Sequence, residues 1–130
     1  MAVSRRQVVL AAFAWFALFG VAASASAQGP DMTNVIAGTN SNQQGWFATV
    51  TYSWYTAYTD RTVNYVLFPV LGNGNYGPGI NGQMKPVGAG SGSATVSYGP
   101  LPAGTYQAFI ALIDSEGNVT SHAEQEFVVN

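Results

Sequence analysis

Apolar and polar residues alternate along several short stretches of this chain. In residues 46–54, one face of an extended strand would carry Trp46, Ala48, Val50, Tyr52 and Trp54. The opposite face would carry the hydroxyl side chains of Thr49, Thr51 and Ser53. A period of two is typical of a β-strand with one buried face. We therefore predict a half-buried strand here.

Other stretches also predict strands, separated by residues that favour turns. They are residues 61–68, 93–98, 105–113 and 123–129, with a short strand around 33–37. Pro69 has no N–H group, so the second strand should continue only as a sheet edge. No stretch after residue 27 keeps a helical period. Several short strands joined by turns predict an all-β sandwich.

Two of the predicted strands are apolar on both faces. In residues 105–113, one face holds Tyr106, Ala108, Ile110 and Leu112, and the other holds Phe109, Ala111 and Ile113. If Tyr65 and Leu67 point into the core, Val66 and Phe68 point outwards. A sheet with one face in water should alternate instead. We predict an interaction surface formed by Val66, Phe68, Phe109 and Ile113. The alternative is that the chain covers this surface itself, with residues 28–45 or 72–92.

Four motifs resemble those of fibronectin type III and related immunoglobulin-like domains. They are the tryptophan strand (50–54), the tyrosine strand (63–67), the tyrosine-corner turn (101–106) and a hairpin (114–118). The resemblance covers residues 46–129 and implies a single antiparallel Greek-key β-sandwich in which strands 61–68 and 105–113 are neighbours. It also implies that the hydroxyl of Tyr106 bonds back to the backbone. The glycine-rich residues 72–92 and the weak first strand depart from the pattern.

The first 27 residues have the organisation of a cleaved signal peptide. Arg5 and Arg6 precede an apolar run, residues 8–23, and Ala25-Ser26-Ala27 provides a cleavage site before Gln28. The run is shorter than the roughly 20 residues of a membrane span, although an uncleaved anchor is the alternative. Residues 4–10 resemble a twin-arginine signal, but the strongly apolar run favours the general secretory route. We expect a bacterial protein exported to periplasm, cell surface or medium, with no membrane insertion after cleavage.

The remaining residues divide into a lead-in, 28–45, and one sandwich domain, 46–130, with the insertion 72–92. After residue 27 the chain keeps two strong bases and six carboxylates, a formal charge of −4. This balance excludes a nucleic-acid partner. There is no cysteine, so the fold must depend on its core alone.

Candidate chemistry is sparse. Residues 72–77 spell G-x-G-x-x-G, but prolines and glycines follow where a dinucleotide site needs a helix, so we expect a flexible loop. His122 is the single histidine, too little for a zinc site. Glu124 and Glu126 share a strand face, which we interpret as a solvated edge rather than a glycosidase pair. We therefore assign no catalytic residue, no cofactor and no metal.

These observations favour a protein that acts by binding. Our leading interpretation is a non-enzymatic protein-interaction or assembly module of the bacterial cell envelope. Its partner would be another envelope protein or a second copy of itself. The alternative is a carbohydrate-binding module that binds polysaccharide by stacking on Tyr55, Tyr58, Tyr76 and Tyr98. A small hydrolase ranks last.

Overall fold

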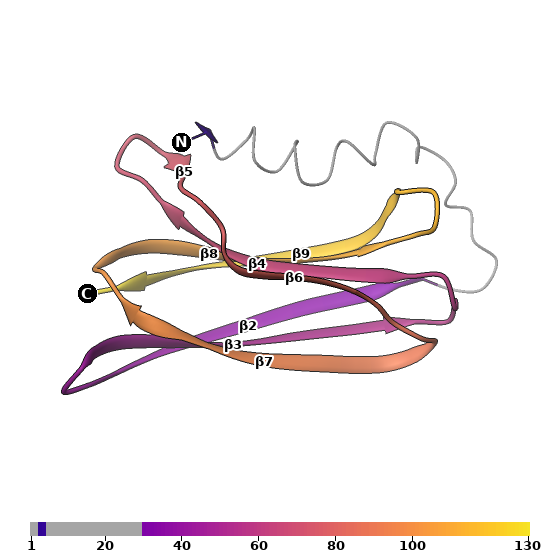
Figure 1. Cartoon of the computed structure of the whole chain (residues 1–130), viewed down its shortest axis with the longest axis horizontal. Coiled ribbons are helices and arrows are strands. Elements are labelled where there is room, and N and C mark those ends of the chain that lie inside the picture. The colour runs from indigo at the N-terminus through magenta and orange to yellow at the C-terminus, as the bar shows by residue number, and fades with distance from the viewer. Residues whose placement is uncertain (1–2, 5–29) are drawn as a thin grey trace.

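The computed structural model describes residues 3–4 and 30–130, and all of its regular elements are strands (Figure 1). Six of the described strands have nine or more residues: β2 (Met32–Asn42), β3 (Gly45–Thr56), β4 (Thr62–Val70), β7 (Gly90–Leu101), β8 (Gly104–Ile113) and β9 (Val119–Val129). The shorter strands are β1 (Val3–Ser4), β5 (Asn75–Tyr76) and β6 (Ile80–Pro86). Among the described residues, no helix is long and apolar enough to cross a membrane.

The strands form two antiparallel sheets, which lie face to face as a β-sandwich (Figure 1). The small sheet has the order β2-β3-β7. The large sheet has the order β1-β5-β4-β8-β9, and β6 also pairs with β4. The predicted neighbours are confirmed, because Val66 on β4 pairs directly with Phe109 on β8. The all-β prediction is therefore confirmed.

The core lies between the sheets and uses the faces that the alternation predicts. Buried members of this cluster include Ala48, Val50, Tyr52 and Trp54 from β3, Tyr65 and Leu67 from β4, and Tyr106, Ala108, Ile110 and Leu112 from β8. The rings of Tyr52 and Tyr65 stack with their centroids 4.5 Å apart. The hydroxyl oxygens of Tyr52 and Tyr98 lie 2.9 Å apart, so two buried polar groups satisfy each other. Large aromatic side chains thus fill a core that has no disulfide.

Two predicted turns fix the ends of β8. At its start, the Tyr106 hydroxyl donates a hydrogen bond to the carbonyl oxygen of Pro102 over 2.6 Å, as the resemblance implied. At its end, the Asp114 carboxylate accepts hydrogen bonds from the backbone N–H groups of Glu116 and Asn118. Gly117 has a φ of 86°, which a glycine adopts without strain. Both stretches stabilise the fold rather than perform chemistry.

Side chains bridge the two sheets where β2 and β9 lie side by side. The Gln125 side-chain oxygen accepts a hydrogen bond from the Ala37 N–H over 2.8 Å. The hydroxyls of Thr33 and Ser121 are also 2.8 Å apart. Both contacts join residues 88 positions apart, so β2 and β9 run in the same direction. The β2 strand is longer than the predicted 33–37 and closes this side of the sandwich.

Residues 72–77, predicted as a flexible loop, belong to an insertion, residues 72–92, that largely forms strands. It contains β5, β6 and the start of β7, and β6 pairs with β4 from Thr62↔Pro86 to Leu67↔Ile80. β6 is half-buried only at Ile80 and exposed at its other residues, so it has no alternation to reveal it. The prediction that the strand continues past Pro69 only as an edge is wrong, because Val70 pairs with Tyr76 on β5 and with Thr105 on β8. The Pro69 carbonyl accepts a hydrogen bond from the Gly77 N–H, so the Pro69 nitrogen, which has no hydrogen to donate, also faces away from β8.

The predicted signal peptide, residues 1–27, lies outside the described residues except for Val3 and Ser4. These two residues pair with Tyr76 and Asn75 at the edge of the large sheet.

Candidate binding surfaces

The four residues of the predicted interaction surface lie together on the outer face of the large sheet. Phe109 and Ile113 come from β8, and Val66 and Phe68 from β4. They belong to a second apolar cluster, separate from the core between the sheets, which we call the outer cluster. Its buried members are Tyr76, Phe109, Ala111 and Ile113, with Val66, Phe68, Val70 and Val119 packed against them. Apolar residues on both faces of β4 and β8 therefore form two clusters.

The outer cluster is not fully exposed. Phe109 and Ile113 are only 2% and 5% exposed, whereas Val66 and Phe68 are half-buried. The Tyr76 ring stacks on Phe68 at a centroid distance of 5.3 Å and meets the Phe109 ring edge-on at 5.6 Å. We considered two segments as covers. Residues 72–92 contribute Tyr76 and the backbone at Gly79 and Gly82, which lies against Val66. Of residues 28–45, Met32–Asn42 form β2 in the other sheet. The accessible part of this surface is therefore centred on Val66 and Phe68.

A polar chain runs beside the outer cluster towards β9. The Tyr76 hydroxyl donates to the Gln107 side-chain oxygen over 2.9 Å, and the Gln107 side-chain nitrogen donates to Glu124 over 2.9 Å. Glu124, Glu126 and His122 all lie exposed on the same face of β9. Within residues 3–4 and 30–130, no three histidine or carboxylate side chains come close enough to hold a metal ion. These hydrogen bonds connect Tyr76 to β9 and help to hold the Tyr76 side chain over the outer cluster.

The outer face of the small sheet has a different chemistry. None of β2, β3 and β7 contains a charged residue. Pairing places polar side chains in rows across the three strands, such as Asn34–Ser53–Ser93. In the next row the hydroxyl oxygens of Thr51 and Thr95 lie 3.2 Å apart. We call this surface the hydroxyl face.

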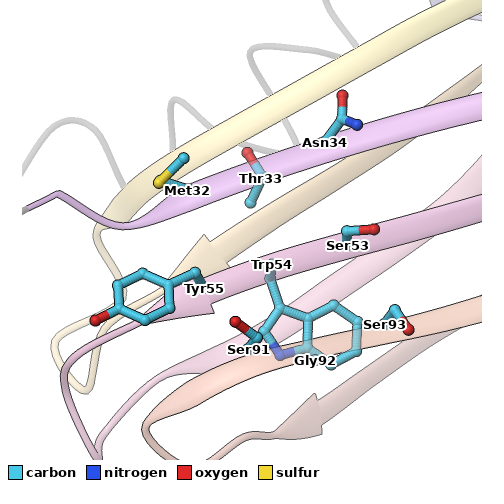
Figure 2. Close-up of a pocket in the computed structure, with 9 residues that line it drawn as sticks. All are labelled: Met32, Thr33, Asn34, Ser53, Trp54, Tyr55, Ser91, Gly92 and Ser93. Atoms are coloured by element: carbon cyan, nitrogen blue, oxygen red, sulfur yellow. The ribbon is translucent and has the colours of Figure 1, made fainter.

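A shallow trough of about 480 Å³ lies at one end of the hydroxyl face (Figure 2). Its lining residues are three consecutive residues from each strand: Met32, Thr33, Asn34, Ser53, Trp54, Tyr55, Ser91, Gly92 and Ser93. The Trp54 side chain points into the core, so its row, Thr33–Trp54–Gly92, forms the floor of the trough. The rows on either side, Met32–Tyr55–Ser91 and Asn34–Ser53–Ser93, form the walls. The Tyr55 ring is 41% exposed in one wall. The trough thus combines an accessible aromatic ring with uncharged hydrogen-bonding groups.

The four tyrosines proposed for sugar stacking do not come together. Tyr98 is 1% exposed in the core, and Tyr76 is 1% exposed in the outer cluster, so the assignment of a stacking role to these two is wrong. Both side chains are buried members of apolar clusters. The sequence alone did not show whether these tyrosines are buried or lie at exposed ends of loops. Only Tyr55 lines the trough.

Tyr58 belongs to an ion-pair cluster at the start of β4. The Arg61 guanidinium carbon lies 4.0 Å from the centre of the Tyr58 ring and covers it. Arg61 pairs with Asp31 over 2.6 Å and with Asp60 over 2.5 Å. Burial opposes the charge on Arg61, but the hydrogen bond and charge of Asp31 raise its pKa above the ordinary value. The cluster ties the chain before β2 to the chain before β4.

Sequence reasoning missed most of the trough. Alternating hydroxyl residues in 49–53 and 91–97 were a signal, since both runs place Ser or Thr on every second position. The trough also needs Met32 and Asn34, which become its neighbours only through the register of β2 on β3. That register was not readable from one strand alone.

Comparisons with known proteins identify no family for this chain. No protein-family model matches it, and no curated protein matches it. Among solved structures, the chain is similar to the putative ApaA protein from Bordetella pertussis, with 17% identity and a TM-score of 0.43 over 77% of this chain and 94% of that one. It is also similar to wild-type OgpA from Akkermansia muciniphila, with 13% identity and a TM-score of 0.42, over 78% of this chain and 28% of OgpA.

Proposed function

We propose that this protein is a non-enzymatic interaction module of the bacterial cell envelope. It binds another envelope protein, or a second copy of itself, through the accessible part of the outer cluster around Val66 and Phe68. The observation that carries the proposal is an apolar cluster on the outside of the large sheet, separate from the core. An outer face with aromatic and aliphatic side chains is typical of an interaction surface.

The proposed domain type is a Greek-key sandwich similar to fibronectin type III. Support comes from the strand orders β2-β3-β7 and β6-β4-β8-β9 and from the hydrogen bond of the corner Tyr106 to Pro102. The proposed location is outside the cytoplasm. It rests on the signal-like organisation of residues 1–27.

The test uses residues 28–130, which contain both apolar clusters in full. Immobilised protein should capture a partner from envelope material, and capture should be lost after protease treatment of that material. Val66→Ser and Phe68→Ser should reduce capture, because each removes half-buried apolar surface from the proposed interface. Phe109 is unsuitable for this test, since its burial makes unfolding the expected result.

Ile36→Ser is the matched control. Ile36 is 59% exposed on the hydroxyl face, so the same chemical change is made on the opposite surface. Circular dichroism and urea unfolding must show that all three variants remain folded. Equal capture by all folded variants would contradict the proposed surface, and capture that survives protease would favour a polysaccharide.

A second candidate function is polysaccharide binding in the trough. It is favoured by the exposed ring of Tyr55 between Met32 and Ser91 in a surface without charge. Aromatic rings stack on the apolar faces of sugars, while serine and asparagine side chains hydrogen-bond to hydroxyl groups. Addition of a neutral polysaccharide should change tyrosine and tryptophan fluorescence. Tyr55→Ala should abolish the change and Tyr58→Ala should keep it, because Arg61 covers Tyr58.

A further inference from the structure

Apart from the two-residue strand β1 beside β5, the described residues form four edge strands, and these differ in how they are protected. Edge strands present unpaired backbone groups, and proteins usually block them with charges, prolines or covering contacts. β9 carries Glu124 and Glu126, and β6 carries Lys85 and ends at Pro86. β2 is uncharged, but Gln125 and Ser121 of β9 bridge to it. Three edges are therefore protected against pairing with another strand.

β7 has one proline, Pro100, near its C-terminal end, and none of these protections over residues 90–98. It is 12 residues long, carries no charge, and pairs on one side with β3, without a second strand partner among the described residues. From Gly90 to Tyr98 its pairing with β3 continues without a register shift. This regular, neutral edge is longer than a typical strand, which has about five or six residues. Such an edge is a site for strand addition.

We propose that β7 pairs antiparallel with β7 of a second copy of this chain, joining two small sheets into one. Pairing of identical strands places each residue near its own symmetry mate, so a charged edge would repel itself. β7 is neutral throughout and free of this repulsion. Because β7 does not repel an identical strand, a second copy of this chain is the partner that we propose for this edge.

Both faces of β7 match themselves in this arrangement. With a two-fold axis at Thr95, Ser93 of one copy lies opposite Ser97 of the second copy, and Ala94 lies opposite Val96. Hydroxyls then meet hydroxyls on the outer face, as Thr51 and Thr95 already do between β3 and β7. Small apolar side chains meet on the inner face, where Ala94 and Val96 pack against the core. This contact is separate from the surface around Val66, so each can fail without the other.

The experiment uses the absence of cysteine from the chain. In residues 28–130 we expect Thr95→Cys to form a disulfide-linked dimer on mild oxidation, because Cα atoms of directly opposite residues lie within about 4.5–5.5 Å. Thr49→Cys is the control. Thr49 is exposed on the same face but in the central strand, so it should form no comparable dimer.

Sedimentation of the unmodified residues 28–130 over a range of concentrations gives the second measurement. We expect a monomer–dimer equilibrium that Thr95→Lys weakens by roughly fivefold or more, since it places like charges opposite each other. Thr49→Lys and Val66→Ser should leave it unchanged. A monomer at every concentration, or equal cross-linking of Thr95→Cys and Thr49→Cys, would overturn the proposal.

Discussion

The two outer faces of this sandwich differ in the side chains that they carry. The large sheet carries a second apolar cluster, buried at Phe109 and Ile113. The small sheet carries rows of hydroxyl and amide side chains with no charge, together with the exposed side chains of Met32, Ile36 and Tyr55. The apolar face needs a cover or a partner, whereas the hydroxyl face is compatible with water. The first face should therefore matter for stability and association, and the second mainly for recognition.

The largest expected effect comes from deleting the centre of the outer cluster. Phe109→Ala should lower the free energy of unfolding by about 3–5 kcal/mol, as for other buried phenylalanines. Ile36→Ala, on the exposed hydroxyl face, should change it by less than about 0.5 kcal/mol. Urea denaturation measures both. Similar values for the two variants would remove the distinction between the faces.

A smaller effect is expected where the hydroxyl face lies over the core. A methyl group at Gly92 would sit 2.5 Å from Nε1 and Cε2 of Trp54. Gly92→Ala should therefore force the indole to move, at a cost of about 1–3 kcal/mol. Gly38→Ala is the control in the same sheet, since nothing lies within 4 Å of its added methyl group. Thermal unfolding of the pair would show whether Trp54 tolerates the change.

Stability should also fall at high pH, because of the tyrosines beneath the hydroxyl face. Burial raises the pKa of Tyr52 and of Tyr98 above the ordinary value, since the charged form is poorly solvated there. The unfolded chain ionises near pH 10, so their contribution is intact below that pH and is lost above it. Each should lower the free energy of unfolding by at most about 1.4 kcal/mol per pH unit above 10, until its hydroxyl also ionises in the folded state. Urea unfolding between pH 9 and 11 measures the slope, and Tyr98→Phe should reduce it.

The smallest effect is expected for the hydroxyls themselves. Thr51→Val removes the contact with Thr95 but leaves a half-buried β-branched residue in a strand. The free energy of unfolding should change by less than about 0.5 kcal/mol. A loss above 1 kcal/mol in urea would mean that the hydroxyl rows stabilise the sheet, contrary to the role we give them.

Much of the fold was predictable because its long strands have regular side-chain patterns. Alternation in residues 46–54 identified β3 and its core face, and the apolar residues on both faces of β4 and β8 indicated two clusters. β6 was missed because it is an edge strand that is largely exposed, so its sequence shows no period. A strand could be predicted from the sequence when one or both of its faces are buried, whatever its length.

The candidate surfaces were less predictable, because they depend on contacts between distant residues. The members of the predicted surface do lie together, but the cover by Tyr76 depends on how residues 72–79 fold back over β4. Tyr55, Tyr58, Tyr76 and Tyr98 looked alike in sequence, yet only Tyr55 reaches the trough. Arg61 covers the ring of Tyr58, and Phe68 on β4 stacks on the ring of Tyr76, so these contacts decide which ring remains accessible.

The parallel run of β2 beside β9 has a mechanical consequence. The start of β2 and the end of β9 lie at opposite ends of the long axis (Figure 1). A force that pulls these ends apart would slide β2 along β9. It would load the Thr33–Ser121 and Ala37–Gln125 bonds together with the Asp31–Arg61 pair, rather than one after another. The sandwich is therefore arranged to resist stretching in shear, a useful property for a small domain that links two anchored partners.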